Sequence, residues 1–354
     1  MRELTVSRAT AGFLRRGHPW VRPDRFTRGL ERLTAGEAVT LVDEKGQGLA
    51  SALADPEAEI CARVYHKQPG KGFDPAAAIA RAWERRAALH ADPGTTCYRV
   101  VHGEGDFLPG LRVERYADVL VMLVRTAAMA AHAKALAAAL HAQCPAARIV
   151  IREQLDDLRR RDISNRSFDG STIDPDEQVL GHEFGVAVHC TPFAGLATGV
   201  YVDQRATRHA LRQGCAGARV LNLFAYTGLF SCSLLAAGAA SATDVDLSAP
   251  ALELAARNAS HNGFNQRYQQ HHGEVRAFLE RDTTTYDLII CDPPTAAQGA
   301  GGWLVRRDYP AVLKALAPRL APGGRLVAIA NTLGKRFDLA RAVREQLPQA
   351  EHLP

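Results

Sequence analysis

The stretch "ARVLNLFAYTGLFSCSLLAAGAASATDVD", residues 218–246, predicts the fold of the C-terminal part of the chain. It contains an apolar strand, a turn that closes at Gly228, a helix and a second strand. Further along, the alternation continues through "SAPALELAARNASHNG", "YDLIICD", "YPAVLKALAPRLAPGG" and "RLVAIAN". Such alternation favours βαβ units, so we predict an α/β fold with a doubly wound parallel sheet covered by helices.

Polar residues end the predicted strands, and this is where open parallel sheets bind ligands; they are Asn222, Asp246, Asp292 and Asn331. The Gly228 turn leads into a helix N-terminus, which suits a carboxylate or a phosphate. Asp246 could accept bonds from both hydroxyls of a ribose, or it could cap the helix that begins near Ser248. Glu274 has a similar choice between an adenine amino group and the dipole of its own helix.

The segment "YDLIICDPPT", residues 286–295, places a cysteine beside an acid at the end of a strand. Two prolines cannot donate to a sheet ladder, so the strand must stop there. Side chains alternate across a strand, so Cys291 and Asp292 should point to opposite faces. We predict that Asp292 faces the ligand crevice and that Cys291 packs against a helix.

The N-terminal part has a different pattern. From Glu37 to Tyr65, short β-branched runs alternate with turn signals and predict a small β-rich unit. Residues 67–75, "KQPGKGFDP", read as a linker before a mixture of helices and strands. Arginines crowd the first 32 residues between Phe13, Trp20 and Phe26, which indicates either a solvated basic face or a contact with RNA.

The composition is that of a globular protein: 354 residues, 47% apolar and 23% charged, enough for two or three domains. No apolar run approaches the ~20 residues of a membrane helix, and the N-terminus lacks a secretory apolar region. We therefore expect a cytoplasmic protein that does not associate with membranes. The seven cysteines lack metal-type spacing, so we expect reduced thiols and no metal site.

Six motifs in order, "TGVYVDQR", "LNLFAYTG", "ATDVDLS", "ARNASHNG", "YDLIICDPPT" and "LAPGGRLV", resemble class I S-adenosylmethionine methyltransferases. The particular resemblance is to the large-subunit ribosomal RNA methyltransferases of the RlmI/RlmK family. "RRGHPWV" with "EAVTLVDEKGQGLA" is similar to the RNA-binding PUA domain of that family, and "YRVVHGEGDFLPGLRVERYADVL" resembles its central domain. The resemblance implies a PUA-like domain at residues 1–70, a central α+β domain at 76–185 and a Rossmann-like methyltransferase domain at 186–354. It also implies S-adenosyl-L-methionine as cofactor and large-subunit ribosomal RNA as partner, and it suggests a homodimer.

The resemblance carries over to individual positions. It implies a cofactor site formed by Thr198, Tyr201, Gln204, Arg205, Asn222, Phe224, Ala225, Tyr226, Thr227, Gly228, Asp246, Leu247, Ser248, Glu274, Val275 and Asp292. It implies catalytic roles for Asp292, Pro293, Pro294, Thr295 and Asn331. One position departs from the pattern, because the family commonly has a lysine where this chain has Ala197.

The cysteines help to choose the methylated atom. A methyl sulfonium is already activated, so the enzyme must mainly hold a nucleophile in line with it. Carbon 5 of cytosine is too weak a nucleophile until a cysteine thiolate adds to the ring, whereas a ring nitrogen needs no adduct. The two places where carbon-methylating family members have that thiol hold Thr295 and the pair Asn331 and Thr332. The absence of both thiols therefore favours a nitrogen as the methylated atom. In addition, "CDPPT" and an Asn followed by "GKRFDL" resemble the RlmK branch of the family, and this resemblance implies N7 of guanine as the target. We then expect Asp292 and the carbonyls of its turn to accept bonds from guanine N1 and the amino group.

Two alternatives remain. The first is a cytosine carbon-5 methyltransferase that uses an unrecognised thiol. The second is a catalytically silent RNA-binding or ribosome-assembly factor. Ala197 and the missing thiol favour this idea, whereas the retained Asp246 and Asp292 oppose it. For either base, the target must be unpaired or flipped out of its helix.

Overall fold

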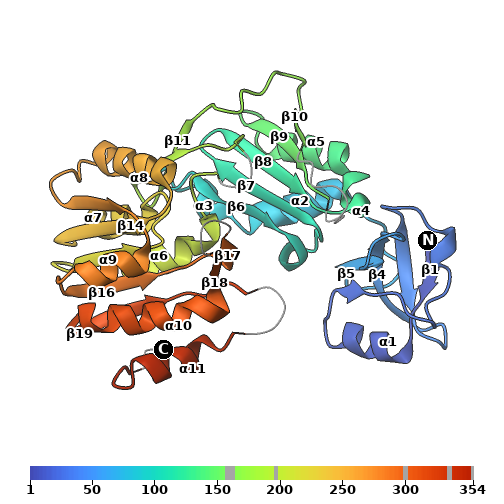
Figure 1. The fold of residues 1–354 in the computed structure, drawn as a ribbon. Helices are drawn as coiled ribbons and strands as arrows, with labels where there is room; N and C mark the ends of the chain where they lie inside the picture. Colours follow the sequence, from blue (N-terminus) through green and yellow to red (C-terminus); the bar gives the residue numbers. More distant parts are fainter. Residues whose placement is uncertain (156–163, 195–197, 298–301, 333–336, 352–354) are drawn as a thin grey trace. The chain divides into compact units, whose positions relative to one another are not determined.

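The computed structural model describes residues 1–155, 164–194, 198–297, 302–332 and 337–351 (Figure 1). The chain packs as two compact units. The first unit comprises residues 1–181 and 190–198, and the second comprises residues 182–189 and 199–354. Within the described residues, no helix is both long enough and apolar enough to cross a bilayer.

The first sheet confirms the β-rich start of the chain. Its order is β1 (Arg2–Thr5), β3 (Ala38–Val42), β4 (Gly48–Ala54), β5 (Ala62–His66) and β2 (Trp20–Val21). Strands β1 and β3 are parallel and the other neighbours are antiparallel. The helices are α1 (Arg8–Arg15) and the short η1 (Leu30–Arg32). Leu4, Val39 and Leu41 are fully buried in the core of this sheet, because alternate apolar residues of the strands face inward.

A second sheet follows in the same unit. Its order is β10 (Ser164–Ser167), β9 (Arg148–Glu153), β8 (Val119–Val124), β7 (Leu111–Tyr116) and β6 (Cys97–His102). Its helices are α2 (Pro75–Glu84), α3 (Ala87–His90), η2 (Gly103–Asp106), α4 (Ala127–Ala130) and α5 (Ala133–Gln143). Helix α2 begins where it does because Asp74 accepts bonds from two backbone N–H groups and Pro75 occupies the first turn. Helix α2 ends at Glu84, and α3 begins separately at Ala87.

The segment predicted as a linker, residues 67–75, is held against the first sheet. The Ser51 hydroxyl donates to the Gln68 carbonyl (2.8 Å) and accepts from the Lys71 N–H (2.9 Å). The Tyr65 hydroxyl donates to the Lys71 carbonyl. Residues 67–74 lack regular structure as expected, whereas Pro75 already opens α2. The bonds from Ser51 and Tyr65 fix the course of the segment.

The second unit confirms the predicted doubly wound sheet. All neighbours are parallel, in the order β15 (Tyr268–His272), β14 (Ser241–Asp246), β13 (Arg219–Leu223), β16 (Tyr286–Cys291) and β19 (Leu320–Ala328). The helices are η3 (Val202–Gln204), α6 (Arg205–Leu211), α7 (Leu229–Ala236), α8 (Ala249–His261), α9 (Val275–Arg281), α10 (Val305–Leu316), η4 (Ala317–Arg319) and α11 (Leu339–Gln346). Helix α7 packs against α6 and α8, and α10 against α9 and α11, so helices cover both faces (Figure 1).

Two hairpins complete the chain: β11 (Val179–Glu183) with β12 (Val186–Cys190), and β17 (Ala296–Ala297) with β18 (Trp303–Leu304). The last strand corrects a prediction, since "RLVAIAN" was expected to begin at Arg325 but β19 begins at Leu320. The pairing with β16 shifts register between Tyr286 and Leu288, and Gly323 has a positive φ of 72°. The strand therefore includes "APGG" as a bulge instead of beginning after it.

Candidate functional site

The turn between β13 and α7 is strained. Phe224 and Tyr226 have φ angles of 59° and 53°, in the left-handed region that bulky side chains avoid. Gly228 follows at 70°, and a Cβ built there would lie 2.4 Å from Asp244 Oδ2 and 2.9 Å from Ala255 Cβ. Only glycine fits this position, and strain of this kind typically gathers where a ligand binds.

A buried polar network lies beneath this turn. Asp244 is fully buried and accepts bonds from Asn222 Nδ2 (2.9 Å), the Tyr268 hydroxyl (2.9 Å) and the Ser231 hydroxyl. Burial raises the pKa of Asp244 to about 6, although these three bonds oppose the shift. The side chain of Asn222, predicted at the cofactor, is 1% exposed and holds Asp244 instead. Sequence reasoning missed Asp244, because nothing local separates it from the strand-end acid two residues on.

Asp246 joins two loops at the end of β14. Its Oδ2 accepts from the Tyr226 N–H and its Oδ1 from the Ser248 N–H, both at 2.8 Å. The residue that caps α8 is Ser248, whose hydroxyl accepts from the Ala251 N–H (3.3 Å). Leu247 between them is 66% exposed. Asp246 therefore fixes the strained turn and still has lone pairs for a ligand hydroxyl.

Glu274 is the N-cap of α9. Its carboxylate accepts from the Ala277 N–H at 2.7 Å, and the next residue, Val275, is buried. The helix-terminal role considered for this acid is therefore the one the structure displays. A ligand amino group would have to use the remaining carboxylate lone pairs.

A second segment, residues 199–205, lies against the same turn. Gly199 donates its N–H to the Tyr226 hydroxyl (2.9 Å), and its carbonyl accepts from the Thr227 hydroxyl (2.6 Å). The rings of Tyr201 and Tyr226 are 5.0 Å apart at their centroids, and Tyr201 is 54% exposed. Ala225 closes the turn on the other side through a bond from its N–H to the Val245 carbonyl (3.1 Å).

A buried ion pair holds Tyr201 in place. Arg208 on α6 makes two 2.6 Å bonds to Glu183, and both side chains are buried. Arg208 Nη2 also donates to the Tyr201 carbonyl (3.0 Å). The partners are 25 residues apart, so no local pattern could have singled out Arg208.

The remaining predicted residues near this segment have mixed surroundings. Gln204 ends η3, and Arg205 opens α6 with its guanidinium 5.0 Å from the Phe184 ring centroid. Thr198 belongs to the first unit, where its hydroxyl lies 2.8 Å from that of Tyr116. Ala197 lies outside the described residues.

The structure at the end of β16 shows where the Cys291 side chain points. This side chain is fully buried among the apolar residues of α10, and burial raises the pKa of the thiol to about 12. The Tyr309 hydroxyl of α10 donates to the Cys291 carbonyl (2.7 Å). The prediction that this cysteine packs against a helix is confirmed. A thiol in this state is neither ionised nor accessible.

Asp292, next to it, is only partly buried. Burial, and then the negative charge of Asp203, raise the pKa of Asp292 to about 6, while Arg208 acts in the opposite direction. The carboxylate has no hydrogen-bond partner among the described residues. A carboxylate with an altered pKa and free acceptor positions at a strand end is a candidate for ligand recognition.

The turn after Asp292 bonds within itself more than predicted. Trp303 Nε1 donates to the Pro294 carbonyl (2.7 Å), and the Thr295 carbonyl accepts from the Val305 N–H (3.1 Å). The Thr295 hydroxyl donates to the carbonyl of Asn331, which lies beyond the end of β19 (2.9 Å). These bonds correct the expectation that all carbonyls of the turn are open acceptors. Among the described residues, the Asp292 carboxylate and the Pro293 carbonyl remain without a bond.

The sheet and its strand ends define the class of protein. An open parallel sheet whose order reverses between β13 and β16, with acids and a strained turn at the carboxyl ends, is a Rossmann-like ligand-binding fold. A family model described as S-adenosylmethionine-dependent methyltransferase matches residues 113–352, and one described as PUA-like domain matches residues 4–67. The chain belongs to the S-adenosylmethionine-dependent methyltransferase family, and its cofactor is S-adenosylmethionine. The resemblance inferred from the motifs is confirmed.

Two relatives are similar to this chain in sequence, and one solved structure is similar to it in fold. A ribosomal RNA large subunit methyltransferase of Deinococcus radiodurans is 34% identical over 348 residues, which cover 92% of this chain and 83% of the relative. Ribosomal RNA large subunit methyltransferase I of Aeromonas hydrophila is 33% identical over 330 residues, covering 89% and 81%. The structure of SMU.776, described as a methyltransferase complexed with SAH, superposes with a TM-score of 0.80 at 23% identity, covering 98% of this chain and 90% of that one. This last likeness shows the fold.

Proposed function

We propose that this protein transfers a methyl group from S-adenosylmethionine to a guanine N7 of large-subunit ribosomal RNA. The RNA substrate is supported by the names of relatives that match along most of the chain. The choice of a nitrogen rests on the cysteines. Six of the seven are buried, and Cys144, half-buried, packs against the core of the first unit.

The described site fits the cofactor. Helix α7 begins at Leu229, and its N-cap residue, Gly228, supplies no side-chain cap. The first N–H groups of the helix can therefore bind the carboxylate of the methionine part. Asp246, held by Tyr226 and Ser248, has acceptor positions left for ribose hydroxyls. The cofactor supplies an activated methyl group on a sulfonium.

The chain's own residues would hold the base. Ionised Asp292 accepts bonds from guanine N1–H and the amino group, and the Pro293 carbonyl adds a further acceptor. The aromatic ring of Tyr201 offers an exposed stacking face beside them in the same unit. With the Watson–Crick edge held in this way, N7 is free to approach the methyl group, and positioning supplies much of the rate gain.

Nucleoside analysis of ribosomal RNA tests this proposal. RNA from cells lacking the gene should lose one 7-methylguanine, which mild reduction and aniline locate by chain cleavage, and the purified enzyme should restore it. Loss of 5-methylcytosine instead would support the cytosine carbon-5 alternative. An unchanged nucleoside profile, together with no transfer in vitro, would support a silent RNA-binding or assembly factor.

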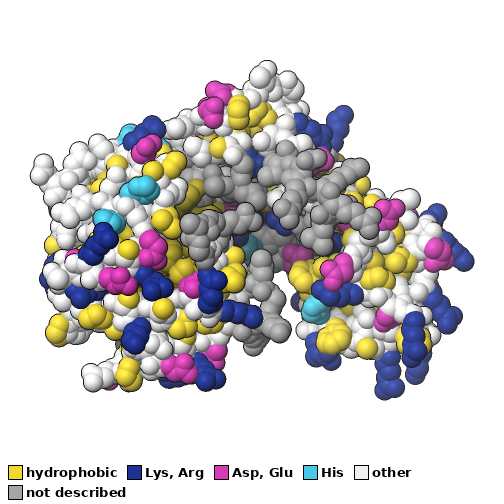
Figure 2. Space-filling view, in the orientation of Figure 1, with side chains coloured by type: hydrophobic (Ala, Val, Ile, Leu, Met, Phe, Trp, Pro, Cys, Tyr) yellow, Lys and Arg dark blue, Asp and Glu magenta, His cyan; other side chains and the backbone are white. Residues whose placement is uncertain are grey.

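We further propose that residues 1–70 form an RNA-binding domain. Phe13 and Phe26 are 52% and 45% exposed, with the guanidinium groups of Arg16 and Arg25 at 4.8 and 4.7 Å from their ring centroids. Figure 2 shows Lys and Arg side chains gathered along the outer edge of the part that Figure 1 draws in blue. Exposed rings beside arginine side chains can stack on bases and contact phosphate.

A further inference from the structure

The first unit contains a pocket that the methyltransferase site does not explain. Its volume is about 260 Å³, and it lies where β5, the segment 67–74, the start of α2 and the η2 turn meet. Its lining includes Tyr65, His66, Lys71, Phe73, Arg81 and Phe107. Pockets that bury a whole drug-sized ligand usually span upwards of about 300 Å³, so this pocket has room for one base but not for a longer stretch of RNA.

Phe107 enters the pocket with a strained backbone. Its φ is 57°, a left-handed conformation that is rare for an aromatic residue. Its N–H donates to the Glu104 carbonyl (3.2 Å), which closes the η2 turn. Strain of this kind persists only where the surroundings enforce it.

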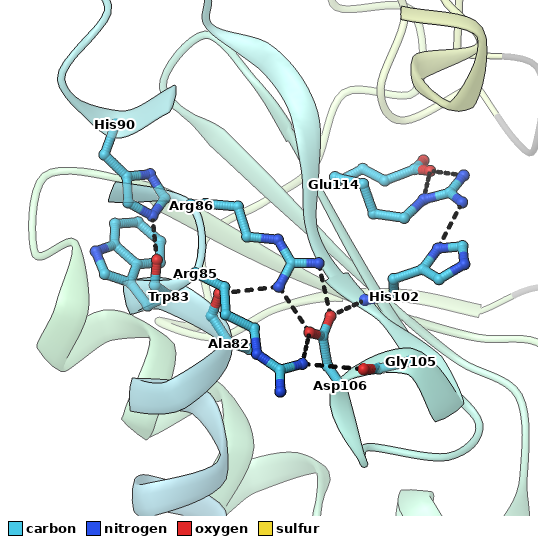
Figure 3. Close-up of polar contacts among 10 residues, drawn as sticks. Ala82, Trp83, Arg85, Arg86, His90, His102, Gly105, Asp106 and Glu114 are labelled. Atoms are coloured by element: carbon cyan, nitrogen blue, oxygen red, sulfur yellow. Dashed lines mark hydrogen bonds and ion pairs between the residues drawn. The ribbon is translucent and has the colours of Figure 1, made fainter. Parts of the chain in front are cut away.

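The enforcing group is Asp106, which is 5% exposed (Figure 3). Arg86 makes two 2.7 Å bonds to its carboxylate, and Arg85 adds one at 2.9 Å. The His102 N–H donates at 2.7 Å, and Arg85 also donates to the Gly105 carbonyl (3.0 Å). These hydrogen bonds hold the turn before Phe107 in place.

Two cations line the pocket. Lys71 and Arg81 are exposed and have no ion pair or side-chain hydrogen bond among the described residues. Asp74 is the acid in the lining, and its Oδ1 is occupied by the N–H groups of the first turn of α2. His66 accepts from the Gln68 N–H through Nδ1, which leaves Nε2 for a ligand.

We propose that this pocket binds one unpaired nucleotide of the RNA substrate, with Lys71 and Arg81 on its phosphate and Phe107 against its base. The inference rests on the proposed function, because RNA is the partner that presents such a unit. A small inorganic anion would account for the cations but not for a ring held by a strained turn. A base with its phosphate accounts for both.

The test measures binding of a fluorescent single-stranded oligoribonucleotide to the full chain by anisotropy at several salt concentrations. Lys71→Ala and Arg81→Ala should each weaken binding about 3-fold to 10-fold, and each should lower the salt slope by about one. Phe107→Gly should weaken it about 5-fold or more through lost stacking. Glycine accepts the positive φ, so this variant should stay folded by circular dichroism. Lys67→Ala, in the same segment but outside the lining, is the matched control and should change affinity less than about 2-fold.

The outcomes separate this inference from the proposed function. If the wild type binds the oligonucleotide but all three variants match Lys67→Ala, the pocket assignment is wrong and the proposed function stands. If the wild type binds cofactor by calorimetry but no RNA, the proposed function fails and the pocket assignment falls with it. Free 5′-AMP should compete only weakly. Tight AMP binding that the variants lose, with unchanged oligonucleotide affinity, would make this a free-nucleotide site instead.

Discussion

Cys291 and Asp292 are neighbours in sequence with opposite environments. The alternation of side chains along β16 turns the thiol into the core and leaves the acid at the strand end. This contrast could be predicted from sequence, because it depends only on the period of a strand. The ion pair between Arg208 and Glu183 and the burial of Asp244 could not be predicted, because both depend on residues brought together from distant segments.

Replacing Cys291 should leave the chemistry intact. Cys291→Ala should retain most methyl transfer, because the thiol is buried with a pKa near 12 and a nitrogen nucleophile needs no adduct. Cys291→Ser should behave similarly but should lose about 1–3 kcal/mol of stability, because it buries a hydroxyl. Thermal melts establish that each variant is folded, and methyl transfer is then compared at equal concentrations of folded protein. The mechanism is contradicted if the Cys291→Ala variant is folded but inactive and the wild-type protein makes 5-methylcytosine.

The Asp292 carboxyl should impose a pH limit. In the free enzyme its pKa is about 6, so the ionised acceptor is lost as the pH falls through 6. We expect kcat/KM to decline below that pH, approaching tenfold per pH unit. Asp292→Asn should be slower by roughly 100-fold and should lack this decline, because it cannot titrate. A wild-type profile that stays flat from pH 5 to 7 would remove Asp292 from base recognition.

At the scale of elements, the turn from β13 into α7 combines three positive φ angles with a contact that excludes any side chain. The strand, the glycine and the following helix were predictable from apolar runs and Gly228. The strain at Phe224 and Tyr226 was not, because aromatic residues carry no signal for a left-handed backbone.

Gly228→Ala should show how much stability is lost when a side chain is added at this close contact. We expect a loss of about 2–5 kcal/mol, from left-handed strain together with overpacking against Asp244 and Ala255. Gly217→Ala is the matched control, because Gly217 has a similar φ of 75° but no atom within 4 Å of a built Cβ. Chemical denaturation compares the two variants, and equal losses would show that strain alone matters.

Two strands mark the limit of pattern reading. The residues of β15, "YQQHH", are mostly exposed and show no apolar alternation, so this edge strand gave no signal. Strand β19 begins at Leu320, before the expected Arg325, because pairing with β16 continues across a bulge at "APGG". Tertiary contacts decided both cases.

At the scale of the whole molecule, the series of sheets and the family were predictable because the motifs recur in order along the chain. The course of residues 67–75 was not, because the bonds from Ser51 that fix it join positions 17 and 20 residues apart. Leu53 and Tyr65 also belong to the core of the second sheet. Deleting residues 1–70 would therefore expose that core, and point variants give a cleaner test of RNA binding.

Removing the arginines that flank the exposed rings should weaken RNA binding. We expect Arg16→Ala with Arg25→Ala to lower the salt slope by up to about two while leaving cofactor affinity unchanged. Arg22→Ala is the control, because Arg22 is already paired with Glu59 at 2.8 Å. Filter binding at several salt concentrations gives the slopes. A double variant that matches the control places the RNA elsewhere.

The division of the chain into units has a consequence for how such genes can recombine. Residues 190–198 return to the first unit, where Arg152 donates to the Pro192 carbonyl (2.6 Å) and Asn165 to the Phe193 carbonyl (3.3 Å). Residues 182–189 remain with the second, where Asn258 accepts from the His189 N–H (2.8 Å). No single crossover point separates the two units without stripping a segment from one of them. The catalytic unit should therefore be inherited together with its neighbour, and chimeras with one junction between residues 182 and 198 should express as insoluble protein.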